Sequence, residues 1–124
     1  MANETLEERN LKVLESYIEY DRTRDSSRYV DDEKAKSAAR LLGELKSKAA
    51  VPLLVKCILV TKSYDAGVSF QKALESIGRP ALVTIETTLD KSRFDGLLIY
   101  PGGPARSHLA VARDNILNAL RPKE

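Results

Sequence analysis

The sequence predicts an all-α protein, a stack of about three antiparallel helix pairs with about six helices in all. Apolar residues recur three and four positions apart along most of the chain, which is the spacing of one helix face. Glycine and proline fall where these periodic segments begin or end. A pattern of the size of one helical hairpin occurs twice, which is typical of a repeat protein.

Composition limits the classes of protein to which the chain can belong. Its 124 residues are 43% hydrophobic and 31% charged, as in a soluble protein with one domain. The 20 basic and 18 acidic residues nearly cancel, which argues against a nucleic-acid partner on charge alone. The only cysteine, Cys57, excludes an internal disulfide and is interpreted as a small buried hydrophobe inside the apolar run 51–60.

The same apolar run is the only candidate membrane segment. It is shorter than the roughly 20 residues that a transmembrane helix needs, and Lys56 interrupts it. Residues 1–8 are acidic and lack an apolar core, so they predict no signal peptide. We therefore expect a cytoplasmic protein without a membrane partner.

Three helices are predicted in the N-terminal half, over about 5–22, 31–46 and 52–60. Thr5 and Glu8 form a capping box at the start of the first helix. Asp31 or Asp32 can cap the second helix, whose apolar face is rich in alanine and ends at Leu45. Pro52 fits the first turn of the third helix, where its missing amide proton costs nothing.

Three further helices are predicted over about 68–77, 80–90 and 105–120. Gly78 closes the fourth helix and Pro80 starts the fifth. The sixth helix is expected to bury an apolar face that ends at Leu120, and Pro122 terminates it. Residues 61–67 are expected to form a loop between the third and fourth helices.

The two copies of the hairpin pattern align at an offset of 32 residues in their first helix and 31 in their second. The matched pairs are Leu42 with Leu74, Leu45 with Ile77, Val51 with Leu82, Leu54 with Ile85, and Ile58 with Leu89. One hairpin cannot bury both of its faces, whereas stacked hairpins share a core. We therefore expect the two copies to lie side by side, with helices at both ends that are polar outside.

The first copy resembles a known repeat. Ala38–Leu45 followed by Ala50–Leu54 is similar to the HEAT-like repeat of phycobilisome lyases, with an Ala-Ala pair, Leu-Gly, a short turn and Ala-Val-Pro-x-Leu. Ala73–Leu82 matches this pattern less closely, so the resemblance covers about Lys34 to Asp90. The resemblance implies a right-handed α-solenoid, but no single function, because the repeat serves many roles.

On this basis the chain is expected to form one HEAT-like domain. Its parts are a capping helix and loop (1–30), a first repeat (31–61), a second repeat (67–90), a long connection (91–104) and a capping helix (105–124). The connection contains Leu97–Tyr100, an apolar segment that must be covered. It is either a strap over the core or a docking segment.

The loops between the repeats form the candidate binding surface. In stacked antiparallel pairs these loops share one edge with the N-termini of alternate helices, whose free amides favour anions. The candidate partner-binding residues are Arg24, Arg28, Tyr29, Lys62, Tyr64, Arg93, Phe94, Tyr100, Arg106 and His108. They are interpreted either as a surface for acidic or phosphorylated groups of another protein, or as ordinary solvated loops. The resemblance also allows an inner surface that includes Leu53, Lys56 and Val60.

No catalytic, metal or cofactor site is expected. His108 is the only histidine, and no cysteine or paired carboxylates stand near it at metal-ligand spacing. Its neighbour Ser107 lies on another face of the helix, so the two do not form a nucleophile and base. Gly102 and Gly103 lack the preceding strand and the following Gly-Lys-Ser of a phosphate loop.

Three functions remain open at this point. The leading one is a non-catalytic scaffold or adaptor that binds another protein. The second is an accessory subunit of an enzyme complex, which the resemblance to the lyase repeats allows. The third is a weak nucleic-acid or anion binder that uses the arginine-rich loop edge.

Overall fold

The computed structural model describes residues 5–24, 26–95 and 104–121. Within these ranges the chain is all-α, with six α-helices, one short 3₁₀ helix and no strand. The elements are α1 (Leu6–Thr23), η1 (Ser26–Arg28), α2 (Asp32–Glu44), α3 (Ala50–Val60), α4 (Tyr64–Ile77), α5 (Arg79–Asp95) and α6 (Pro104–Leu120). None of the helices in this part of the chain combines the length and the apolar character needed to cross a bilayer.

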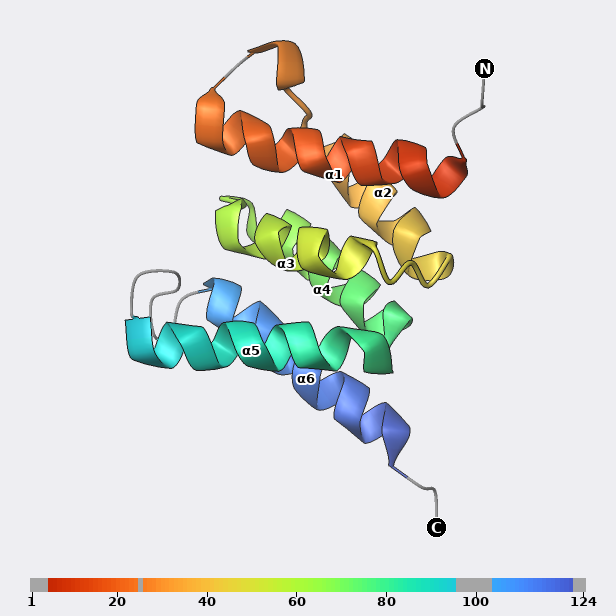
Figure 1. Cartoon of the computed structure of the whole chain (residues 1–124), viewed down its shortest axis with the longest axis vertical. Helices are drawn as coiled ribbons and strands as arrows, with labels where there is room; N and C mark the ends of the chain where they lie inside the picture. Colours follow the sequence, from red (N-terminus) through yellow and green to blue (C-terminus); the bar gives the residue numbers. More distant parts are fainter. Residues whose placement is uncertain (1–4, 25, 96–103, 122–124) are drawn as a thin grey trace.

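The helices form two layers (Figure 1). Helices α1, α3 and α5 lie one below another in the front layer, and α2, α4 and α6 run obliquely behind them. Across the layers the closest pairs are α1 with α2, α3 with α4, and α5 with α6. Helices α2 and α3 contact each other little, so the spatial pairs are offset by one helix from the sequence repeats 31–61 and 67–90.

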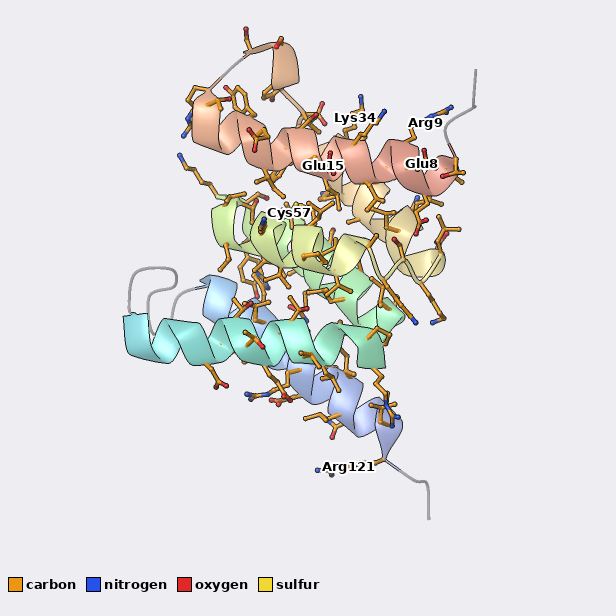
Figure 2. All side chains as sticks on the ribbon, viewed as in Figure 1. Glu8, Arg9, Glu15, Lys34, Cys57 and Arg121 are labelled. Atoms are coloured by element: carbon orange, nitrogen blue, oxygen red, sulfur yellow. The ribbon has the colours of Figure 1, made fainter. Side chains whose placement is uncertain are left out.

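The core fills the space between the layers. Its largest fully buried side chains are Phe70, Leu14, Leu42, Leu54, Ile58, Leu74, Ile85, Leu109 and Ile116. These residues come from all six helices and form one continuous cluster. Charged side chains such as Glu8, Arg9 and Glu15 lie on the outside of α1, whereas Cys57 lies within the stack (Figure 2).

Several predicted caps are present. The Thr5 hydroxyl accepts a hydrogen bond from the Glu8 amide at 3.1 Å, and the Asp31 carboxylate accepts one from the Lys34 amide at 2.8 Å. Gly78 ends α4 in the left-handed region, with a φ of 83° that residues with a side chain rarely adopt. The capping residues therefore fix three helix ends as the sequence indicated.

The predicted loop 61–67 is wrong, because α4 begins at Tyr64 and only residues 61–63 are non-helical. Ser63 is the reason, since its hydroxyl accepts a hydrogen bond from the Ala66 amide at 3.1 Å and starts the helix early. Helix α5 extends to Asp95, so the first residues of the predicted connection 91–104 are helical. The segment Leu97–Tyr100 lies outside the described residues.

Two predicted core positions are exposed. Leu45 is 46% exposed because α2 ends at Glu44, which leaves Leu45 as the C-cap and turns its side chain outward. Leu120 is 42% exposed at the last residue of α6, where no further helix covers it among the described residues. In both cases the helical period of apolar residues continues to the end of the helix, where the side chain is no longer fully covered.

Several helix ends lie together at one edge of the stack. The C-terminal ends of α1, α3 and α5 and the N-terminal ends of α4 and α6 lie on the left in Figure 1, with η1 above them. The turn between α2 and α3 lies at the opposite edge. The connection 61–63, which the sequence pattern placed between repeats, lies at this edge, although α3 and α4, which it joins, form one of the closest pairs.

Candidate functional site

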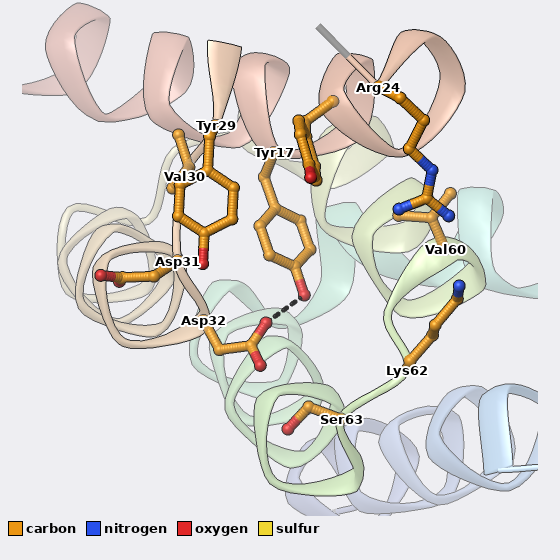
Figure 3. A pocket seen from close by; sticks show the side chains of 10 residues that line it. Tyr17, Arg24, Tyr29, Val30, Asp31, Asp32, Val60, Lys62 and Ser63 are labelled. Atoms are coloured by element: carbon orange, nitrogen blue, oxygen red, sulfur yellow. Dashed lines mark hydrogen bonds between the residues drawn. The ribbon is translucent and has the colours of Figure 1, made fainter. Parts of the chain in front are cut away.

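A pocket of about 300 Å³ lies at the loop edge, between the C-terminal half of α1, residues 29–32 and residues 60–63 (Figure 3). Three segments that are distant in sequence therefore contribute to it. The lining residues are Tyr17, Tyr20, Arg24, Tyr29, Val30, Asp31, Asp32, Val60, Lys62 and Ser63. The volume is at the lower end of the range for small-molecule sites, and it can hold a group of the size of one side chain.

Tyr17 connects the segments that line the pocket through its hydrogen bonds. Its hydroxyl donates to Asp32 Oδ1 at 2.7 Å, and it lies 2.7 Å from Thr61 Oγ1, which is then the donor of the second hydrogen bond. Its ring meets Phe70 of the core edge-on, with 5.7 Å between the ring centroids. Burial of the hydroxyl is the main cause that raises the pKa of Tyr17 above its usual value. Tyr17 therefore stays neutral and links α1, α2 and the α3–α4 connection.

Two further tyrosines form an aromatic wall. Tyr20 and Tyr29 pack edge to face, with 5.1 Å between the ring centroids and an interplanar angle of 79°. Tyr29 is 59% exposed, so much of its ring remains available to another molecule. The Arg24 guanidinium lies over the Tyr20 ring, 5.7 Å from its centroid, within the range of a cation–π contact.

The charges of the pocket are separated. Arg24 and Lys62 extend toward one another near Val60, and Asp31 and Asp32 lie on the opposite side (Figure 3). Both aspartates make internal hydrogen bonds, Asp31 to the Lys34 amide and Asp32 to the Tyr17 hydroxyl. Lys62 makes no hydrogen bond or ion pair with any residue that the structure describes.

The structure brings three of the sequence-predicted residues into this pocket, namely Arg24, Tyr29 and Lys62. Tyr64 lies apart from them, in the first turn of α4, where its ring packs 5.0 Å from that of His108 and is 68% exposed. Tyr100 and the side chains of Arg28, Arg93, Phe94 and Arg106 lie outside the described part of the chain.

The sequence placed His108 among the exposed residues of the loop edge. In the structure the residue is buried, with only 3% of its surface exposed. Nδ1 lies 3.0 Å from Gln71 Oε1, and Nε2 has no hydrogen-bond partner among the described residues. Burial lowers the pKa of His108 below its usual value. His108 is therefore a neutral core residue between α4 and α6.

Tyr17, Tyr20 and Asp32 were not among the predicted binding residues. Tyr17 was assigned to the apolar stripe of the first helix, and Asp32 was interpreted as a possible helix cap. A signal was present, because Tyr17, Tyr20 and Arg24 are spaced by three and four residues and so share one helix face. That face could be connected to residues 29–32 and 60–63 only through the packing of the helices.

A second hollow of about 340 Å³ lies between α2 and α4. It includes the cations Lys36, Arg40 and Lys72 together with Glu33 and Glu44. The Lys36 ammonium is held by Asp65 at 2.6 Å and by Glu33 at 2.8 Å, and these hydrogen bonds raise its pKa. Because the groove contains charges of both signs, it is a weak candidate for a nucleic-acid surface.

The described residues contain no group of three or more histidine, cysteine, aspartate or glutamate side chains that could hold a metal ion. Cys57 is buried, and burial raises the pKa of its thiol well above the usual value. No family model, no curated protein and no solved structure matches this chain.

Proposed function

We propose that the chain is a non-catalytic interaction module of the HEAT-like kind, which binds another protein through the pocket at its loop edge. One observation carries the proposal: three tyrosines and two cations from three segments surround a single open pocket. Tyrosine and arginine are the residues that most often dominate the energetics of protein interfaces.

The rigidity of the pocket supports a binding role. The hydrogen bonds of Tyr17 to Asp32 and Thr61 fix the segments that line the pocket in the unbound protein. A preformed surface loses less conformational entropy on association than a flexible loop does. The partly exposed Tyr29 ring can therefore bury apolar area against a partner at a small ordering cost.

The HEAT-like assignment is part of the same proposal. The two layers of helices, with α2 on α4 and α4 on α6, are the arrangement expected of stacked hairpins. The accessory-subunit alternative would use the same edge, with an enzyme as the partner. The nucleic-acid alternative would use the arginine-rich loop edge, and Asp31 and Asp32, which lie in the same pocket as Arg24 and Lys62, weaken it.

The test is capture of a partner with matched variants. The tagged chain, a Tyr29→Ala/Lys62→Glu variant and a Lys48→Glu control would be compared by quantitative mass spectrometry in cells that express the protein. Lys48 is exposed in the turn at the opposite edge, so its variant makes the same charge reversal away from the pocket.

We expect one protein to be retained by the wild type and by Lys48→Glu, and to be reduced at least about tenfold by the pocket variant. The interaction would then be measured with the purified partner by calorimetry. Equal retention by the pocket variant, or binding only to nucleic acid with a steep salt dependence, would overturn the proposal.

A further inference from the structure

A hollow of about 440 Å³ lies between the N-terminal half of α1 and the length of α2. None of the residues that line it also lines the loop-edge pocket. On α1 the lining includes Arg9 and Val13, which are four residues apart and share one face of the helix. The hollow is therefore a separate candidate surface, at the other half of α1.

The inner part of this hollow is apolar. Val13, Ala38 and Leu41 line it, and each of them is more buried than the charged residues around them. Ala38 is 2% exposed, whereas Val13 and Leu41 stay partly exposed. A hollow of this size with an apolar floor can bury one large side chain of another molecule.

Positive charge surrounds the apolar floor. Arg9, Lys34 and Arg40 line the hollow with exposed side chains, and Glu44 is the only acidic residue among its lining. Figure 2 shows Arg9 and Lys34 on the same side of α1, at the top of the stack. The side chains of the three cations form no hydrogen bond or ion pair with any residue that the structure describes. Such a rim favours a ligand that carries negative charge at its edges.

The positive charge continues across α2. Arg40 and Glu44 also line the second hollow, between α2 and α4, where Lys72 adds a further cation. Glu33 in that hollow is bound to Lys36 at 2.8 Å, so its charge is already compensated. Among the described residues of the two hollows, the charged groups without an ion pair are therefore mostly positive.

We propose that the α1–α2 hollow is a second docking surface, for a segment of a partner protein in which one large apolar side chain is flanked by aspartate or glutamate. Burial of the apolar side chain on the floor contributes most of the affinity. The flanking carboxylates face the three cations of the rim. Because those cations are exposed, they select the partner more than they strengthen its binding. A polynucleotide has no apolar side chain for the floor and is repelled by Glu44.

The experiment selects peptides from a displayed random library on the immobilised full chain. Counter-selection on a Lys34→Glu/Arg40→Glu variant removes sequences that bind elsewhere, including those that bind the loop-edge pocket. A synthetic peptide with the selected sequence is then measured by fluorescence anisotropy beside two analogues. Replacing its apolar residue by alanine should weaken binding at least about tenfold. Replacing its acidic residues by their amides should weaken binding at least about threefold.

Three variants locate the contact. Lys34→Glu/Arg40→Glu should weaken the selected peptide at least about tenfold, because two attractive charges become repulsive. The control Lys48→Glu/Lys62→Glu changes the net charge equally, at the α2–α3 turn and in the loop-edge pocket, and should bind like the wild type. Leu41→Gln changes no charge, keeps a good helix former and should also bind at least about tenfold more weakly. Thermal unfolding of each variant confirms that folded proteins are compared.

The docking surface is refuted if no selected sequence depends on Lys34 and Arg40, or if the selected sequences lack an apolar residue with acidic neighbours. Equal loss of the peptide in the Lys48→Glu/Lys62→Glu control, or full affinity of Leu41→Gln, would refute it as well. Self-association of the chain that Lys34→Glu/Arg40→Glu abolishes, measured by sedimentation, would assign the hollow to a second copy instead. The capture experiment with Tyr29→Ala/Lys62→Glu concerns the loop edge alone, so the two proposals fail separately.

Discussion

Gly67 of α4 lies directly against the imidazole of His108 of α6. A Cβ at position 67 would fall 2.5 Å from His108 Nε2 and 2.7 Å from Cδ2, both closer than real Cβ contacts. The ring is held in place by Gln71, whose Oε1 faces Nδ1 while its Nε2 donates to Glu75 at 2.9 Å. The absence of a side chain at Gly67 is therefore what allows α4 and α6 to approach around a buried histidine.

Gly67→Ala should destabilise the fold. Overpacking a buried site costs about 1–3 kcal/mol, which exceeds the gain of about 1 kcal/mol from replacing a helical glycine by alanine when the ring cannot move. The free energy of unfolding, measured with urea, is the readout. In the His108→Ala background the same substitution should become neutral or stabilising, and an equal cost in both backgrounds would show that the ring is not the obstacle.

Burial of His108 predicts a pH dependence of stability. The pKa of His108 is lower in the folded state than in the unfolded state, where it is about 6.5. As the pH falls, the unfolded chain therefore binds a proton at a higher pH than the folded chain does. The free energy of unfolding should therefore fall as the pH drops below about 6.5, by at most about 1.4 kcal/mol per pH unit.

The control for this dependence is His108→Gln. The carboxylate of Glu75, which accepts hydrogen bonds from Gln71 and Asn115, and the nearby Tyr64 ring remain in both proteins. Their contribution therefore cancels when the two stability curves are subtracted. A difference that stays constant between about pH 7.5 and 5 would contradict the assignment of the pH dependence to His108.

Tyr17→Phe should cost about 1–2 kcal/mol of unfolding free energy, because Asp32 and Thr61 each lose a hydrogen bond. The contact of the ring with Phe70 is retained, so the loss reports the hydroxyl alone. Tyr29→Phe is the matched control, since Tyr29 is largely exposed and its hydroxyl makes no hydrogen bond with any residue that the structure describes. Thermal and urea unfolding of the two variants should differ; equal stability would mean that the Tyr17 hydrogen bonds contribute nothing.

Cys57 should be unreactive in the native protein. Its side chain is fully buried, and burial raises the pKa of the thiol, so very little thiolate forms at neutral pH. A thiol reagent such as dithiobisnitrobenzoate should react at a rate limited by opening of the stack, and rapidly in denaturant. Fast stoichiometric labelling under native conditions would place Cys57 at the surface and contradict the packing of α3.

The helices could be predicted from sequence because their signals are local. Thr5, Asp31 and Gly78 cap helices through contacts within a few residues. The apolar residues that recur three and four positions apart are mostly buried in the core. The exposure of Leu45 and Leu120 could not be predicted, because it depends on where α2 and α6 themselves end and on which other helices cover those ends. The pairing of α3 with α4 has the same non-local origin.

The site could be predicted only in part. The loop-edge argument found Arg24, Tyr29 and Lys62, because in stacked pairs such loops gather at one edge. It missed Tyr17, since a helical tyrosine among apolar residues gives no sign that its hydroxyl reaches Asp32 and Thr61. It misplaced His108, because the space beside Gly67 that buries the ring belongs to another helix.

Chemical-shift mapping of the isotope-labelled chain with its purified partner tests the central claim most directly. If the pocket between α1, α2 and the α3–α4 connection is the binding surface, the amides of residues 29–32 and 60–63 will change most. Those of the turn 45–49 at the opposite edge will not change. Changes confined to that turn, or to the outer faces of α1, α3 and α5, would contradict the account.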